Sequence, residues 1–148
     1  MAVFLLDINL LLALAWPTHP QHNAAHRWFS GISPTDSWAT CPITQCGFVR
    51  ISSNPKFTPD ALAPAAAIVL LETIVRQPAH TFWPDDVAIT DSLHMPRKAL
   101  QGHQQITDAY LFALSKSRGG KLATLDQGIA SLAATQTELE AIVIINQT

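Results

Sequence analysis

The segment Val3-Phe4-Leu5-Leu6-Asp7 decides how this sequence folds, because it joins a fully apolar run to a carboxylate at its end. A continuous apolar run is typical of a strand that is buried on both faces, as in a parallel sheet. The pattern returns late in the chain, where Lys121-Leu122-Ala123-Thr124-Leu125 leads into Asp126. We therefore predict two strands of one parallel sheet, each followed by an aspartate.

A third aspartate, Asp108, opens a further apolar stretch. We predict a helix over residues 106–116, with Thr107 as its N-cap and Gly119 near its end. In an open parallel sheet, ligands bind at the edge where the carboxyl ends of the strands meet. Carboxylates gathered there repel one another unless a cation lies between them, and oxygen ligands favour Mg²⁺ or Mn²⁺. The three aspartates therefore predict a metal site.

Each aspartate also has a purely structural explanation. Asp7 and Asp126 are suited to cap the helices that follow them, and the helix dipole favours Asp108 in a first turn. The metal-site interpretation is stronger because all three occur in the same strand-to-helix pattern. Thr124, two residues before Asp126, adds a hydroxyl, and Asn9, two residues after Asp7, adds an amide oxygen.

Segments typical of strands and of helices alternate along the rest of the chain. Further strands are expected at residues 38–41, 81–83 and 142–145. Further helices are expected at residues 9–16, 22–31, 43–52, 60–76 (the longest) and 127–132. This alternation predicts the α/β class with a mainly parallel sheet, and residues 1–148 show no internal domain boundary.

The composition limits the classes of protein to which the chain can belong. Its 148 residues suit one domain, and 48% of them are hydrophobic while only 14% are charged. So few charges favour a further apolar face that is buried in a dimer or against another protein. No apolar run approaches the roughly 20 residues of a membrane span, and the N-terminus lacks the basic start of a signal peptide. We expect a cytoplasmic protein with no membrane partner.

Cys41 and Cys46 are the only cysteines. No second Cys or His pair stands at zinc-finger spacing, so they do not predict a zinc site. We expect both to be buried free thiols.

The net charge of −2 does not exclude a nucleic acid as partner, because a cation bound by the three aspartates would leave the remainder of the chain positive. Five cations stand near Asp108 or Asp126 in the sequence: Arg97, Lys98, Lys116, Arg118 and Lys121. A local basic rim of this kind can hold a phosphate backbone. Alternatively, Lys116 and Arg118 are the cations that the dipole favours at a helix end.

Other polar and aromatic residues give weaker signals. His19, His22 and His26 have the spacing of one helix face, but Pro20 interrupts it, and helix-edge histidines are the expected outcome. His103 is expected to be a loop histidine. The four tryptophans have the faces on which bases stack, yet core packing suits so apolar a chain better.

Four stretches, taken in order, resemble the VapC-type PIN-domain ribonucleases, the toxins of bacterial toxin–antitoxin pairs. They are Asp7-Ile8-Asn9-Leu10-Leu11, Pro42-Ile43-Thr44-Gln45-Cys46-Gly47-Phe48-Val49-Arg50, Ile106-Thr107-Asp108-Ala109-Tyr110-Leu111 and Leu122-Ala123-Thr124-Leu125-Asp126. The resemblance implies a three-layer α/β/α PIN-like domain, Mg²⁺ or Mn²⁺ dependence and endoribonuclease activity. It also implies a homodimer and a cognate antitoxin that wraps the toxin and blocks its site.

The resemblance also implies roles for single residues. Asp7 and Asp108 would be metal ligands, and Asp126 would bind a second ion directly or through water. Gln45 stands where the family pattern has a glutamate, so it keeps a carbonyl oxygen but loses the charge. A natural variant of reduced activity, a degenerate toxin that only binds, and a sequence altered to tolerate expression all fit this residue. Arg50 is a candidate for contact with the substrate or a partner.

The resulting prediction is a metal-dependent endoribonuclease toxin. The alternative is a catalytically impaired PIN-like module that binds an antitoxin or RNA without cleaving it. A phosphatase with Asp7 as nucleophile uses similar strand-end chemistry, but such enzymes usually have a second acid two residues later, where Asn9 stands. A signalling receiver domain would need a lysine after a late strand, and the chain offers no good candidate.

Overall fold

The computed structural model describes residues 1–147, in which five strands form one sheet in the order β3-β2-β1-β4-β5. The strands are β1 (Val3–Leu6), β2 (Ser37–Thr40), β3 (His80–Phe82), β4 (Lys121–Thr124) and β5 (Ile142–Ile144). Every neighbouring pair is parallel. All five carboxyl ends therefore lie at one edge of the sheet, as the sequence predicted.

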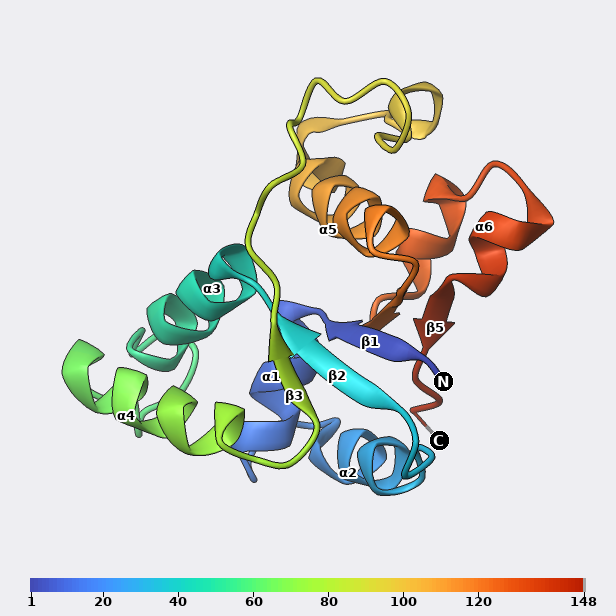
Figure 1. Ribbon diagram of the computed structural model, residues 1–148. Helices are drawn as coiled ribbons and strands as arrows, with labels where there is room; N and C mark the ends of the chain where they lie inside the picture. Colours follow the sequence, from blue (N-terminus) through green and yellow to red (C-terminus); the bar gives the residue numbers. More distant parts are fainter. Residues whose placement is uncertain (148) are drawn as a thin grey trace.

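Helices cover both faces of the sheet, which gives the predicted three-layer α/β/α architecture (Figure 1). The α-helices are α1 (Ile8–Ala15), α2 (His22–Ser30), α3 (Pro42–Ser52), α4 (Pro64–Val75), α5 (Ile106–Ser117) and α6 (Gln136–Glu140). Three short 3₁₀ helices are η1 (Arg97–Ala99), η2 (His103–Gln105) and η3 (Gln127–Leu132). The core on one face includes side chains of α1 to α4, and the core on the other includes α5 and η3.

Side chains of β1 pack alternately into the two cores. Phe4 and Leu6 pack among α1 and α2, whereas Leu5 packs under α5. Leu5 and Leu6 are fully buried, which is why this strand reads as a continuous apolar run. Trp38 and Trp83 are also buried in these cores, so the expectation of core packing is confirmed for both.

One predicted helix start and one predicted N-cap are wrong. The helix expected from residue 60 begins only at Pro64, because a residue that precedes proline is disfavoured in the helical region, and Ala63 is extended with ψ 148°. Thr107 is not the N-cap of α5. The 3₁₀ turn η2 leads straight into that helix, so Gln105 occupies the cap position and gives no side-chain cap.

A long segment of irregular chain and 3₁₀ turns joins β3 to α5 (residues 83–105). It arches over α5 on the outside of the molecule and contains η1 and η2 (Figure 1). Connections of this length in compact domains are uncommon and usually functional. Among residues 1–147, no helix has the length and apolar character that crossing a bilayer requires.

Candidate active site

The candidate site lies where the strand order reverses. From β1 the chain continues to β2 on one side, and it returns later to β4 on the other side. Ligands of open α/β sheets bind in the crevice at such a switch point, outside the carboxyl ends of the strands. Asp7 directly follows β1, and Asp126 follows the end of β4 by two residues. The backbone N–H of Asp7 donates to the carbonyl of Ala123 at 2.9 Å, which joins the two strand ends.

Asp7 is held in one orientation although it is only 5% exposed. One carboxylate oxygen accepts the N–H of Ile8 at 2.8 Å, and the other accepts the hydroxyl of Thr124 at 2.8 Å. Burial raises the pKa of Asp7, the hydrogen bonds from Thr124 and Ile8 lower it, and the charge of Asp126 adds to the increase. No basic side chain within residues 1–147 forms an ion pair with Asp7.

Thr124 connects Asp7 to Asp126. While its hydroxyl donates to Asp7, its oxygen accepts the backbone N–H of Asp126 at 3.0 Å. Asp126 caps η3, accepting the N–H of Gly128 at 2.8 Å, and its side chain is exposed. The capping roles expected of Asp7 and Asp126 are therefore real, and they leave both carboxylates at the same strand edge.

Asp108 lies in the first turn of α5, half-buried. Burial raises its pKa to about 6, with further increases from the negative charges of Asp7 and Asp126. The structure thus brings the three predicted aspartates within electrostatic reach of one another. Asp108 and Asp126 both line a hollow of about 210 Å³, which we call the acidic hollow; its other lining residues are Gln104, Gln105, Gly128, Ile129 and Leu132.

The carboxylates do not form a closed metal cage. Across the part of the chain that the structure describes, no three His, Cys, Asp or Glu side chains meet as a ligand group for an ion. Mg²⁺ does not need such a cage, since one or two carboxylates usually hold it together with water and substrate phosphates. One buried, one half-buried and one exposed carboxylate, which repel each other and have no cationic side chain paired with them among the described residues, are a donor set that suits an open site of this kind.

Gln45 is oriented by the sheet. Its amide nitrogen donates to the hydroxyl of Thr40 at 3.0 Å, and this hydroxyl lies 2.8 Å from Nε2 of His80. Burial lowers the pKa of His80, and the tautomer of its neutral ring determines whether Nε2 donates to Thr40 or accepts from it. No hydrogen bond within residues 1–147 joins Gln45 to Asp7, Asp108 or Asp126.

The supporting residues lie around the site, not in it. Asn9 is exposed on the first turn of α1, and Arg50 is exposed on α3. Arg50 lines a separate hollow of about 340 Å³, which we call the α3 hollow, with Ile8, Pro42, Ile43, Cys46, Asp85 and Thr107. Cys46 is exposed there, so the prediction of two buried thiols is wrong for Cys46 and confirmed for Cys41.

Asp85 is a polar residue of this region that sequence reasoning missed. One of its oxygens accepts the N–H of Ile43 at 3.2 Å, at the N-terminus of α3. The other is buried without a hydrogen-bond partner in the described residues. Asp85 belongs to the irregular segment before α5, where no periodic pattern marks a residue as important. Its only sequence signal is the stretch Trp83-Pro84-Asp85-Asp86, in which two acidic residues follow a proline.

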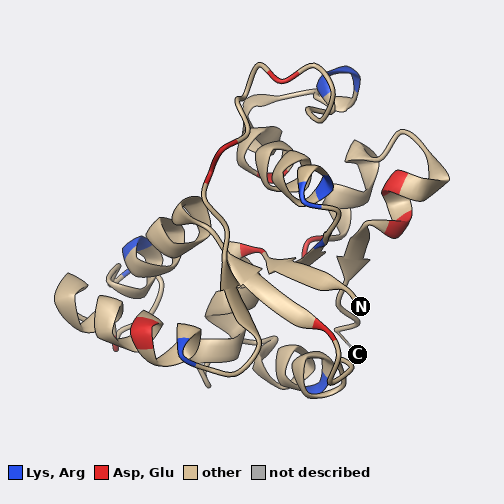
Figure 2. Cartoon of the chain, in the orientation of Figure 1, with Lys and Arg blue, Asp and Glu red and all other residues tan. Residues whose placement is uncertain are grey.

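The predicted basic rim is only partly present (Figure 2). Lys121 opens β4, whereas Asp126 follows the other end of that strand, so they lie at opposite edges of the sheet. Arg118 pairs with Asp86 at 2.8 Å, and Lys116 pairs with Glu138 at 3.1 Å. Of these three cations, Lys121 therefore lies away from the aspartates, and Arg118 and Lys116 are each paired with a carboxylate.

His22 and His26 confirm the expectation of helix-edge histidines, whereas His19 lies in the bend before α2. His22 and His26 lie on α2 with a ring nitrogen 2.7 Å and 2.8 Å from the carbonyls of Ala13 and Leu14 at the end of α1. They therefore satisfy the last turn of a neighbouring helix. His103 is exposed in η2.

Comparison with known proteins decides the family. The PIN domain pattern matches residues 4–135. Ribonuclease VapC39 of Mycobacterium tuberculosis is 45% identical over 130 residues, which is 88% of this chain and 93% of that protein. The chain belongs to the PIN-domain VapC ribonuclease family.

Further relatives agree with this assignment. Ribonuclease VapC38 of Mycobacterium tuberculosis is 41% identical to this VapC-family chain over 143 residues, covering 95% of this chain and 99% of that protein. A chain of the Rickettsia felis VapBC2 structure, solved with a DNA fragment from the promoter, superimposes with a TM-score of 0.61, covering 99% of each chain. At 10% identity, that likeness confirms the fold.

Proposed function

We propose that this VapC-family chain is a metal-dependent endoribonuclease and the toxin of a toxin–antitoxin pair. One observation carries the proposal: at the switch point of the sheet, the charge of Asp126 contributes to the raised pKa of Asp7, and the charges of Asp7 and Asp126 contribute to the raised pKa of Asp108. A cation removes that repulsion, and a phosphodiester brings further oxygen ligands to it. The ribonuclease names of the relatives support the reaction class.

We assign Asp7 and Asp108 as ligands of Mg²⁺ or Mn²⁺, and Asp126 as a ligand of a second ion directly or through water. When bound, such an ion polarises a phosphoryl oxygen and lowers the pKa of bound water. The residues of the chain orient the reactants. Thr124 fixes the Asp7 carboxylate, and Asp126 accepts a hydrogen bond from the attacking water while its other oxygen caps η3.

Gln45, Asn9 and Arg50 take supporting roles in this proposal. The bond from Gln45 to Thr40 presents the amide from α3, where its carbonyl oxygen can approach a cation without adding charge. Asn9 offers a neutral donor and acceptor beside Asp7. Arg50 provides a cation in the α3 hollow for an RNA phosphate or for a partner.

We further propose a cognate antitoxin as the protein partner, because toxin–antitoxin complexes are among the solved structures that share this fold. Gln45 keeps a second function open, namely a PIN-like module that binds an antitoxin or RNA without cleavage. Because the amide of Gln45 is neutral, the site holds one negative charge fewer than it would with the glutamate of the family pattern.

Cleavage of a structured RNA pool tests the proposal. We expect the parent to cleave with Mg²⁺ or Mn²⁺ and to stop in EDTA. Asp7→Asn and Asp108→Asn each remove a ligand charge and should lower the rate by about 100-fold or more, which corresponds to roughly 3 kcal/mol of transition-state stabilisation. Asp60→Asn, an exposed residue outside the site, is the matched control.

The outcomes separate the two functions. Undiminished cleavage by Asp108→Asn at limiting Mg²⁺ would refute the ligand assignment. Cleavage by Gln45→Glu alone would mean that the parent is the binding module. If neither chain cleaves, the nuclease proposal fails.

A further inference from the structure

A second hollow lies beside the acidic hollow, between α5, the segment 92–99 and α6. It measures about 290 Å³, and we call it the basic hollow. Its charged lining residues are Arg97, Lys98, Lys116 and Glu138, three cations against one carboxylate. Lys116 and Glu138 neutralise each other at 3.1 Å, so the charges of Arg97 and Lys98 give the hollow its positive sign.

The two hollows share one lining residue. Leu132, only 1% exposed, lines both the acidic hollow and the basic hollow. Lys116 and Glu138 in turn line a third hollow that reaches Gly120 and Lys121. The three hollows follow α5 from Asp108 at its first turn towards its C-terminal end. The 12 residues of α5 span about 18 Å, room for roughly five stacked nucleotides.

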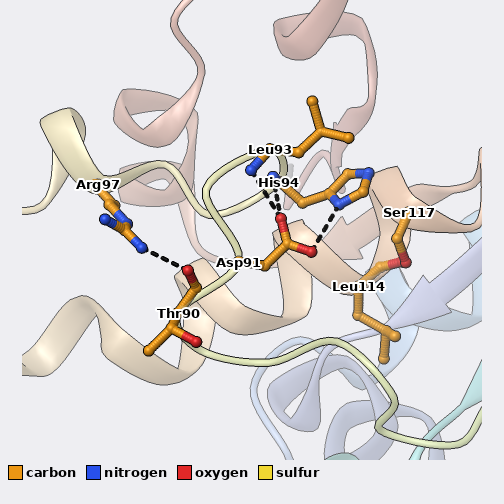
Figure 3. Close-up of polar contacts among 7 residues, drawn as sticks. All are labelled: Thr90, Asp91, Leu93, His94, Arg97, Leu114 and Ser117. Carbon is orange, nitrogen blue, oxygen red and sulfur yellow. Dashed lines mark hydrogen bonds and ion pairs between the residues drawn. The ribbon is translucent and has the colours of Figure 1, made fainter.

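The segment that carries Arg97 and Lys98 is fixed by its own hydrogen bonds (Figure 3). The Asp91 carboxylate accepts the N–H groups of Leu93 and His94 at 2.8 Å each, and it lies 3.3 Å from Nδ1 of His94. Arg97 donates one N–H to the carbonyl of Thr90. Asp91 is therefore hydrogen-bonded within its own turn, and it forms no ion pair with Arg97 or Lys98 among the described residues.

Both cations are available to a ligand. Arg97 is exposed and keeps further guanidinium donors beyond the one used on Thr90. Lys98 is exposed and forms no hydrogen bond or ion pair with another residue among those the structure describes. Such side chains, aligned beside a site for phosphate chemistry, have the chemistry of contacts to a nucleic-acid backbone, which position a substrate without reading its sequence.

We propose that the basic hollow holds the sugar–phosphate backbone of the RNA on one side of the bond to be cut, with Arg97 and Lys98 as phosphate contacts. This inference rests on the proposed function, because the acidic hollow is taken as the place of cleavage. It assigns a direction to the substrate, which leaves the acidic hollow along α5 over Leu132.

The test measures binding apart from cleavage. The probe is a 12-nucleotide single-stranded RNA with a fluorescent end, titrated in EDTA at several salt concentrations and followed by anisotropy. The test variant is Arg97→Ala/Lys98→Ala. The control is Lys56→Ala/Arg76→Ala, which removes two exposed cations from the opposite layer. The single variant Lys98→Ala is measured as well, because this substitution disturbs no hydrogen bond of the segment.

We expect the test variant to bind at least about 10-fold more weakly at low salt, and the slope of log Kd against log salt to fall by about 1.4, for two phosphate contacts on a single strand. Lys98→Ala should give about half of that change in slope, and the control should stay within about twofold of the parent. Equal losses in test and control variants, or no loss in the test variant, overturn the proposal.

A cleavage arm keeps this inference separate from the proposed function. With Mg²⁺ we expect the test variant to raise KM for the 12-nucleotide RNA and to leave kcat within about twofold of the parent. If the parent binds RNA through these residues but does not cleave, the inference stands and the nuclease proposal fails. If kcat falls with unchanged KM, Arg97 and Lys98 do not bind the backbone and the inference fails.

Discussion

At Asp108 a single carboxylate opposes the stability of the fold, because burial and the charges of Asp7 and Asp126 raise its pKa from 3.8 to about 6. The folded state therefore binds a proton more tightly than the unfolded chain does. Below pH 3.8 the carboxyl group is protonated in both states and lowers the free energy of unfolding least. As the pH rises through 6, its ionisation in the folded state lowers that free energy. At neutral pH without metal, the ionised carboxylate destabilises the fold.

The first prediction follows from that sign. In EDTA at pH 7.5, Asp108→Asn should unfold at a higher urea concentration than the parent. The expected gain in the free energy of unfolding is about 1 kcal/mol once solvent screening of this half-exposed group is allowed for. The difference should shrink towards zero as the pH is lowered below 4. Asp60→Asn is the control. A variant that is less stable than the parent at pH 7.5 would contradict the electrostatic account.

The side-chain amide of Gln45 influences which neighbours the hydroxyl of Thr40 can donate to or accept from. Its N–H donates to the hydroxyl oxygen of Thr40, which leaves that hydroxyl able either to donate to Nε2 of His80 or to accept from it. A glutamate at position 45 accepts only, so the hydroxyl must turn towards it and His80 must then donate.

The second prediction is that Gln45→Glu increases Mg²⁺ affinity or cleavage rate, because it restores a negative charge, and that it also raises the pKa of His80. Calorimetry measures the first effect and NMR titration of the imidazole the second. Thr40→Val in the Gln45→Glu background is the control, since it removes the link to His80. If the pKa of His80 stays unchanged in Gln45→Glu, the hydrogen-bond chain is not as described.

At the scale of the elements, the site depends on how closely α1 and α3 pack. Gly47 of α3 lies against Ile8 of α1, so closely that a Cβ added there would overlap Cδ1 of Ile8 and come within 2.9 Å of its Cγ1. Ile8 is also the residue whose N–H binds the Asp7 carboxylate. The contact between the two helices thus sets the distance between Gln45 on one and Asp7 on the other.

The third prediction is that Gly47→Ala destabilises the fold by about 1–3 kcal/mol, the usual cost of overpacking, and that it lowers cleavage more than this loss of stability explains. Gly102→Ala is a matched control, because nothing lies within 4 Å of a Cβ added there. Urea denaturation and cleavage rates measure the two effects. Equal behaviour of the two alanine variants would exclude the packing effect.

At the scale of the whole molecule, large apolar side chains stay exposed on α4 and β3, and others are exposed elsewhere, among them Leu93 (81%) in the segment before α5 and Leu139 (40%) in α6. Ile68 and Val69 of α4 are 48% and 60% exposed, and Phe82 of the edge strand β3 is 51% exposed. Where such side chains form one patch, the patch usually marks a site at which another protein binds. This observation agrees with the sequence-based prediction of a homodimer or a protein partner.

The fourth prediction is therefore a homodimer of about twice the 16.1 kDa chain mass, measured by light scattering after gel filtration over a range of concentrations. Burial of apolar surface drives such association, so raised salt should not dissociate it. A molar mass of one chain at every concentration would show that the homodimer prediction is wrong.

The sequence by itself determined the layers of the fold and the positions of the three aspartates along it. Buried strands such as β1 are short continuous apolar runs, and the residue that follows each run must lie at the strand edge. Both features are local, so a single segment encodes them. The resemblance to the family added the order of the four sequence stretches and singled out Gln45.

Only the tertiary structure decided which polar side chains meet. The strand order placed β1 beside β4 and thereby let Thr124 join Asp7 to Asp126, while strand direction sent Lys121 to the far edge of the sheet. The fold of the irregular segment 83–105 set Asp85 against α3 and Arg97 and Lys98 beside the acidic hollow. These placements depend on contacts between residues far apart in the chain, and apolar periodicity carries no information about such contacts.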